Sequence, residues 1–159
     1  MIEVTASVLA GHPFLRGMPP GQLDALAAAA SDVTFPAGHR IFEEGGFAGK
    51  FWLIQSGHVV LDVNVPGIGR DIVDTIGIGD LLGCSWLFPP YRWAFGAMCV
   101  TPVRAFEFEA AAIRARCADD PEFGAEFRER PLRVLARRLQ GTRARLIAAS
   151  VSRPMSGDV

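Results

Sequence analysis

Short runs in which apolar and polar residues alternate dominate the middle of the chain. The clearest run is 58–65, where every second residue from Val59 to Val65 is valine or leucine. This period of two is typical of a half-buried strand. Eight candidate strands follow one another with glycine or proline turns between them: 33–35, 39–43, 51–55, 58–65, 70–76, 80–83, 93–101 and 103–108. The spacing predicts a mainly β fold, an antiparallel, jelly-roll-like β-roll over about residues 32–108.

Helical patterns flank this region. Leu23, Leu26, Ala27 and Ala30 share one face at helical spacing, which predicts a short N-terminal helix. Asp119–Glu122 has the aspartate, proline and early acid of a helix start, and Pro131 predicts a break or kink soon after it. Apolar or small residues then recur at spacings of three and four, at Leu132, Leu135, Leu139, Thr142, Leu146 and Ala149. This pattern predicts a long C-terminal helix that packs on a partner.

Composition bounds the class of protein. The chain has 159 residues, half of them apolar, and a formal net charge of −1. It is therefore expected to fold as one domain over residues 1–150, with C-terminal helices at about 110–150 and a flexible tail at 151–159. No global charge attracts it to nucleic acid or acidic membranes. The lack of a basic leader or a long apolar run, together with three cysteines, favours a cytoplasmic protein without a membrane partner.

Candidate chemistry concentrates in residues 79–94. A strand would end at Gly83, one helical turn could form over Cys84–Phe88, and Arg92 follows two prolines. Glycine permits close approach of the backbone, the first amides of a helical turn are unpaired donors, and arginine can clamp a phosphate. The segment is therefore a candidate anion site. An ordinary strand–turn–strand connection with a surface arginine would give the same local pattern.

Several glycine-containing segments in fixed order suggest a family. They are Phe-Pro-Ala-Gly at 35–38, Ile-Phe-Glu-Glu-Gly at 41–45, Phe-Trp-Leu-Ile-Gln-Ser-Gly-His-Val at 51–59 and Gly-Asp-Leu-Leu-Gly at 79–83. Over roughly residues 12–149 the chain resembles the cyclic nucleotide-binding domain family. The resemblance implies cyclic AMP or cyclic GMP bound inside the roll. It also implies a short helix after the last strand, and a long C-terminal helix that covers the pocket and often mediates dimerisation.

The resemblance also implies roles for individual residues. Gly83 and the amides of Cys84 and Ser85 would face the cyclic phosphate, and Arg92 would neutralise it. Leu61 and Val73 would line the base side of the pocket.

Two positions depart from the family pattern. The family has a glutamate, which accepts the ribose 2′-hydroxyl, where this chain has Cys84, and Trp93 replaces a small residue. Losing a charged hydrogen bond of roughly 1.5–3 kcal/mol would weaken binding about tenfold to a hundredfold or more. Trp93 could stack on a base or fill the pocket, and Cys84 could be a reactive thiolate near Arg92 or a small packed residue.

Other chemistries find less support in the sequence. His12, His39 and His58 do not form the His-x-His pair of cupin-type metal enzymes, so no metal is expected. No nucleophile–base pair, P-loop or dinucleotide fingerprint is present. About ten residues follow Ala149, too few for a helix-turn-helix module, so sequence-specific DNA binding is not expected.

The sequence therefore predicts a non-enzymatic, cofactor-free ligand-sensing module that dimerises through its C-terminal helix. Its ligand would be a cyclic nucleotide or another small molecule that carries a phosphate. A protein-interaction module with a degenerate pocket and an unidentified protein effector is the alternative, and a cupin-like enzyme is less favoured. Candidates for contacts with the pocket or a partner are the arginines of the last helix, Arg133, Arg137, Arg138, Arg143 and Arg145.

Overall fold

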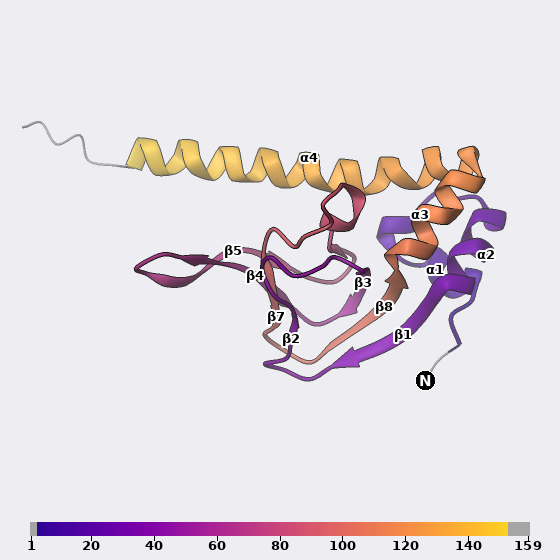
Figure 1. Ribbon diagram of the computed structural model, residues 1–159, viewed down its shortest axis with the longest axis horizontal. Coiled ribbons are helices and arrows are strands. Elements are labelled where there is room, and N and C mark those ends of the chain that lie inside the picture. The colour runs from indigo at the N-terminus through magenta and orange to yellow at the C-terminus, as the bar shows by residue number, and fades with distance from the viewer. Residues whose placement is uncertain (1–2, 153–159) are drawn as a thin grey trace, which may run out of the picture.

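Eight antiparallel strands in two sheets form the centre of the molecule, as the sequence predicts. The computed structural model describes residues 3–152. The strands are β1 (Ala30–Phe35), β2 (Arg40–Phe42), β3 (Lys50–Ser56), β4 (Val59–Val65), β5 (Gly69–Ile76), β6 (Leu81–Leu82), β7 (Gly96–Cys99) and β8 (Val103–Glu109). One sheet has the order β1-β8-β3-β6 and the other the order β2-β7-β4-β5. The two sheets form a β-roll below a long helix (Figure 1).

Helices precede and follow the roll. They are α1 (Ala6–Ala10), η1 (Pro13–Leu15), α2 (Pro20–Ala29), η2 (Ser85–Leu87), α3 (Ala110–Asp119) and α4 (Pro121–Ser152). The predicted N-terminal helix is confirmed as α2, except that Ala30, which the prediction placed on the helix face, is the first residue of β1. The sequence did not predict α1 and η1, because pieces of five and three residues are too short to show a helical period. The predicted tail from residue 151 still has two helical residues, and the remainder of it lies outside the described residues.

The predicted break at Pro131 is wrong, because α4 continues through it. Proline lacks an amide hydrogen and crowds the preceding turn, so a helix carries it only when other contacts compensate. Phe127 and Val134 are both buried in the core, and together they anchor the helix on either side of Pro131. The Arg130 guanidinium donates to the Glu126 carbonyl (2.6 Å) and to the Arg16 carbonyl (3.1 Å). Packing on the core therefore overrides the local preference of proline.

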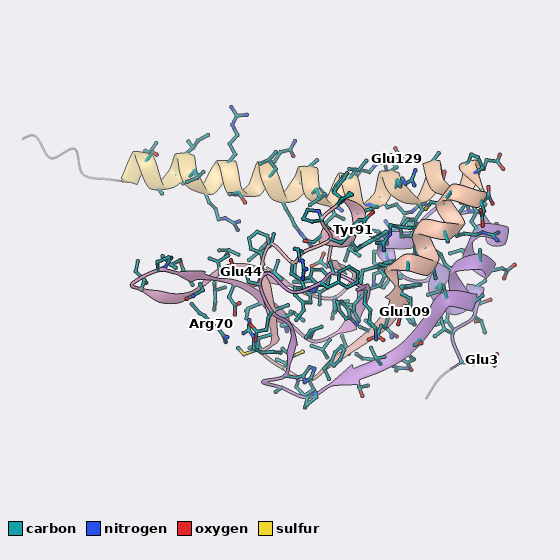
Figure 2. The ribbon with its side chains drawn as sticks, viewed as in Figure 1. Glu3, Glu44, Arg70, Tyr91, Glu109 and Glu129 are labelled. Carbon is teal, nitrogen blue, oxygen red and sulfur yellow. The ribbon has the colours of Figure 1, made fainter. Side chains whose placement is uncertain are left out.

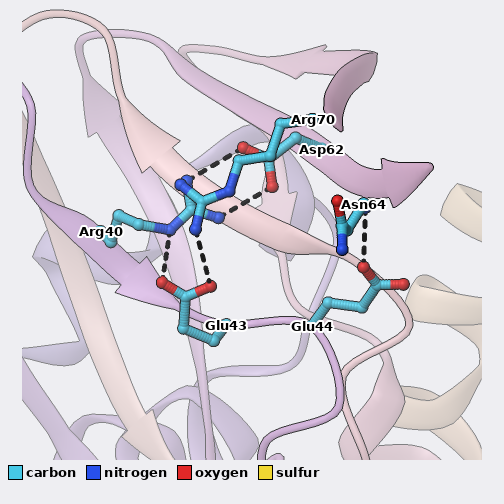
Figure 3. Close-up of polar contacts among 6 residues, drawn as sticks. All are labelled: Arg40, Glu43, Glu44, Asp62, Asn64 and Arg70. Atoms are coloured by element: carbon cyan, nitrogen blue, oxygen red, sulfur yellow. Dashed lines mark hydrogen bonds and ion pairs between the residues drawn. The ribbon is translucent and has the colours of Figure 1, made fainter. Parts of the chain in front are cut away.

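The alternation predicted for β4 is interrupted at Asp62, which the pattern placed on a polar face but which is 6% exposed. The register with β5 shifts between Leu61 and Asp62. The Asp62 carboxylate accepts two hydrogen bonds from Arg40, at 2.8 and 3.0 Å, and Arg40 also pairs with Glu43 (Figure 3). This hydrogen bonding from Arg40 lowers the pKa of Asp62. A bulge and an ion pair thus bury a carboxylate that alternation alone would expose.

Among residues 3–152, no helix is both long enough and apolar enough to cross a membrane.

Candidate functional site

The turn between β6 and β7, residues 83–95, is called the cassette turn below. It begins at Gly83, whose φ of 99° is unfavourable for residues with a side chain. A Cβ atom there would lie 3.0 Å from the Trp93 ring, so space also requires glycine. Trp86, in the short helix η2, is buried and donates from Nε1 to the Gly83 carbonyl at 3.0 Å. The turn is therefore held in place by aromatic side chains of its own sequence.

A cavity of about 700 Å³ lies between the cassette turn, strands β4 and β5, and α4. Six of the seven residues that the sequence nominated line it: Leu61, Val73, Gly83, Cys84, Ser85 and Trp93. The other lining residues are Phe42, Asp74, Phe88, Ala94, Phe95, Leu135, Arg138, Leu139, Thr142, Arg145 and Leu146. The lining is mostly apolar, and α4 contributes its largest polar groups. α4 lies across the roll above this region, and the cassette turn reaches up to it (Figure 1).

Arg92 is the nominated residue that the structure does not bring to the cavity. It is exposed, and its backbone pairs with Phe47 in an isolated antiparallel bridge. The next residue, Trp93, is buried in the cavity wall. Successive residues of extended chain point to opposite sides. The local backbone that turns Trp93 inward therefore turns Arg92 outward.

Trp93 packs inside the roll. Its ring is 6% exposed and stacks on Phe42 with a centroid distance of 3.8 Å. It also lies against Gly83, as described above. Trp93 thus fills the part of the roll next to the start of the cassette turn, and the open cavity lies between it and α4.

Cys84 is the residue that the resemblance aligns with the family glutamate. It is half-buried, and its Sγ lies 4.0 Å from Nη1 of Arg138. Burial raises the pKa of the Cys84 thiol, and the nearby Arg138 charge opposes this only in part. The hypothesis of a favoured thiolate is therefore not supported, and the side chain is a neutral, small wall residue at neutral pH.

Two arginines of α4, Arg138 and Arg145, are the cationic side chains in the lining. Arg138 is half-buried and donates from Nη2 to the carbonyl of Leu81, the first residue of β6. Arg145 is exposed and donates to the Thr142 hydroxyl at 3.2 Å. The sequence named both only within a set of five arginines. Their helical spacing with Leu135, another lining residue, is the signal that could have separated them from Arg143.

The cassette turn also contacts the helices directly. Nη1 of Arg114, from α3, donates to the Trp86 carbonyl at 2.8 Å, and its guanidinium lies 4.2 Å from the ring centroid of Tyr91. Tyr91, labelled in Figure 2, belongs to this turn. The Trp86 ring stacks on Phe51 with a centroid distance of 4.6 Å, and its centroid lies 6.0 Å from that of the Phe127 ring of α4. A shift of the turn would therefore disturb contacts with both α3 and α4.

Metal chemistry has no visible basis in the part of the chain that the structure describes. Within it, no group of three or more histidine, cysteine or acidic side chains is arranged to hold a metal ion. His12, one of the three candidate histidines, is buried and bonded to the backbone of Ile54 and Phe14.

The structure thus combines a β-roll, a cassette turn and a helix that lies across them. A family model described as the cyclic nucleotide-binding domain matches residues 32–120. The chain belongs to this family.

Individual relatives agree with that assignment. A CRP-like cAMP-activated global transcriptional regulator from Mycobacterium tuberculosis is 33% identical over 135 residues, which are 85% of this chain and 58% of that protein. The chain thus spans less than two thirds of the length of this curated relative. A putative cyclic nucleotide-binding protein from Geobacter metallireducens has a similar fold, with a TM-score of 0.77 and 24% identity, over 87% of this chain and 99% of that one. A cyclic nucleotide-binding domain from Methylobacillus flagellatus gives a TM-score of 0.76 at 17% identity, over 83% and 74% of the two chains.

Proposed function

We propose that this protein is a non-enzymatic sensor that binds a small ligand in the cavity between the cassette turn and α4. The observation that carries the proposal is the cavity itself. Residues nominated from the sequence for phosphate and base contacts, including Gly83, Ser85 and Leu61, line one continuous space of about 700 Å³. Pockets of this size hold small ligands and cofactors. A cyclic nucleotide is the first candidate, because the family is defined by that ligand.

Binding would act on α4. The cavity has walls from both the roll and α4, so a ligand in it contacts the helix directly. A ligand shifts a conformational equilibrium only if it binds the two states differently. Two placements of α4 would give a ligand different contacts with Leu135, Leu139 and Leu146. The position of α4 is therefore the proposed output.

A second copy of the chain is the proposed partner of α4. Leu139 and Leu146 are 70% and 65% exposed, and Ile147 and Val151 are 56% and 80% exposed. All four residues belong to the C-terminal half of α4, which lies above the β4–β5 hairpin in Figure 1. The leucine spacing predicted from the sequence suits a helix–helix contact, and such a contact would cover them. An unidentified protein effector would then read the dimer.

The alternative function is an interaction module with a closed pocket. The open cavity argues against it. Trp93 fills only part of the roll, and the space beneath α4 remains large enough for a ligand.

Isothermal titration calorimetry with cyclic AMP and cyclic GMP tests the proposal. We expect the wild-type protein to give heat with at least one of them at millimolar concentration or below. The Ala94→Trp variant should bind more weakly, because Ala94 is an exposed residue of the cavity lining and a larger side chain there narrows the cavity. Because Cys84 replaces the glutamate, 2′-deoxy cyclic AMP should bind within about twofold of cyclic AMP. No heat from either nucleotide at millimolar concentration would contradict a cyclic nucleotide ligand.

A further inference from the structure

The cationic side chains of the cavity lining are both on α4, and none is on the cassette turn. We propose that Arg138, assisted by Arg145, receives the anionic group of the ligand, and that the ligand class is a small monoanion with an apolar or aromatic body. The inference rests on the proposed function, since it concerns the same cavity. It differs from the sequence expectation, in which Arg92 neutralised the phosphate.

Arg138 reaches from α4 to the start of the cassette turn. Its guanidinium is held at the entry to the cassette turn by the Leu81 carbonyl and lies next to the Cys84 sulfur. Arginine has five N–H donors, and these two contacts leave others to point at a ligand. Gly83 and Ser85 line the same space. An anion near the first amides of the cassette turn would therefore meet Arg138.

The charged residues that line the cavity are mostly positive. Within residues 3–152, neither Arg138 nor Arg145 has an ion-pair partner within 4.0 Å. Asp74 also lines the cavity, so two arginines and one aspartate give the lining a net charge of +1. The Asp74 carboxylate accepts a hydrogen bond from the Thr75 amide at 2.8 Å. A singly charged anion would balance this lining.

Apolar side chains form most of the cavity walls. Phe42, Leu61 and Trp93 on the roll side face Leu135 and Leu139 on the helix side. Such walls stabilise a ligand body by excluding water from it. Cys84 provides no carboxylate for a sugar hydroxyl. The chemistry thus favours an apolar or aromatic body over a strongly hydrogen-bonding one.

The consequence for sensing is direct. Because the proposed anion partners lie on α4, the charge of the ligand would act directly on the helix whose position is the proposed output. Arg138 lies at the cassette turn, whereas Arg145 lies two helical turns further along, roughly 10 Å away. Arg138 would make the close contact, and the exposed Arg145 would contribute a weaker attraction that salt screens.

Two fluorescent probes with one aromatic body test this. 1-Anilinonaphthalene-8-sulfonate carries a negative charge, and N-phenyl-1-naphthylamine lacks the sulfonate. We expect Arg138→Met to weaken the sulfonate probe at least about tenfold and Arg145→Met about twofold to fivefold, with the neutral probe within twofold of wild type. Arg138→Lys should restore part of the affinity, and Asp74→Asn should strengthen the sulfonate probe about twofold to fivefold. Arg143→Met, on an exposed site of the same helix outside the lining, and Arg92→Ala are the matched controls and should change neither probe.

The outcomes separate the two proposals. If both probes bind and Ala94→Trp weakens both, but Arg138→Met changes neither, the arginine assignment is wrong and the ligand cavity stands. If Ala94→Trp weakens neither probe, the cavity does not bind them and both proposals fail. Displacement of the sulfonate probe by cyclic AMP, phenyl phosphate or benzoate distinguishes a nucleotide, a simple phosphate and a carboxylate as the source of the anion. Displacement by none of them at millimolar concentration would overturn the proposed ligand class.

Discussion

Single residues in this protein are explained by their contacts more than by their chemical type. Arg92 and Arg138 carry the same side chain. The backbone direction at Trp93 places the first outside the cavity, and the helical period of α4 places the second inside it. Cys84 likewise has no special reactivity, because burial raises its pKa. At this scale function follows from placement.

His12 provides a prediction about stability and pH. Its Nδ1 accepts a hydrogen bond from the Phe14 amide (3.2 Å), so its Nε2 carries the proton and donates to the Ile54 carbonyl (2.9 Å). Burial lowers the pKa of His12. The unfolded chain therefore binds a proton near pH 6.5 that the folded chain does not bind. We expect the contribution of His12 to the free energy of unfolding to be constant above about pH 7 and to fall as the pH drops below about 6.5.

Urea unfolding between pH 5 and 8 measures this effect. The contribution of His12 to the slope should approach at most about 1.4 kcal/mol per pH unit, the value for one proton. His12→Gln should be less stable at pH 8 and should have a shallower slope below pH 6.5. An unchanged slope in that variant would show that His12 is not the titrating group.

At the scale of elements, much of the architecture could be predicted from the sequence. Alternation in β4 and the regular turn glycines gave all eight strands, and the leucine spacing gave the last helix. Pro131 misled the prediction, because local propensity does not register Phe127 and Val134 anchored on the core. Asp62 misled it because a bulge and the Arg40 side chain are tertiary features. Six cavity residues of the roll followed from the comparison with the family pattern, whereas others, such as Phe42 and Phe95, did not. The helix residues of the lining could not be singled out without knowing how α4 is rotated about its axis.

Two glycines in α4 give a prediction with opposite signs. A Cβ at Gly141 would have nothing within 4 Å, whereas one at Gly124 would lie 2.8 Å from the Cys117 carbonyl. Alanine has a helix propensity about 1 kcal/mol better than glycine. Gly141→Ala should therefore slow amide exchange in residues 139–146 about fivefold, while Gly124→Ala should lower the free energy of unfolding.

Hydrogen exchange of the two variants and urea titrations provide the comparison. Faster exchange around residue 141 in Gly141→Ala would show that this glycine serves a close contact that one chain alone does not display, such as a crossing between two copies of α4.

At the scale of the whole molecule, the fold divides into a packed roll and a helix that leaves it. The roll buries a cluster of aromatic residues that includes Phe51, Trp86 and Phe108, whereas Leu139 and Leu146 in the C-terminal half of α4 are exposed. The arrangement suits a sensor because residues of both the roll and α4 line the cavity. The surface that covers the exposed leucines of α4 determines the oligomeric state of the protein.

Dimerisation gives the prediction at this scale. The double variant Leu139→Glu/Leu146→Glu should shift the protein from dimer to monomer, because it places charges in the proposed contact. The double variant Ala144→Glu/Ala148→Glu adds two carboxylates at exposed positions on the side of the same helix opposite to Leu139 and Leu146, and it should stay dimeric. Sedimentation equilibrium at micromolar concentration measures the mass. A wild-type protein that is monomeric under these conditions would contradict the proposed dimer.

The central claim is that a ligand binds between the cassette turn and α4, and hydrogen exchange in millimolar cyclic AMP tests it most directly. We expect slower exchange in two separate segments, residues 81–87 and residues 135–146, and no change in β1, which lies at the opposite edge of the sheet from β6. Unchanged exchange in both segments, or protection confined to a different part of the molecule, would contradict the account.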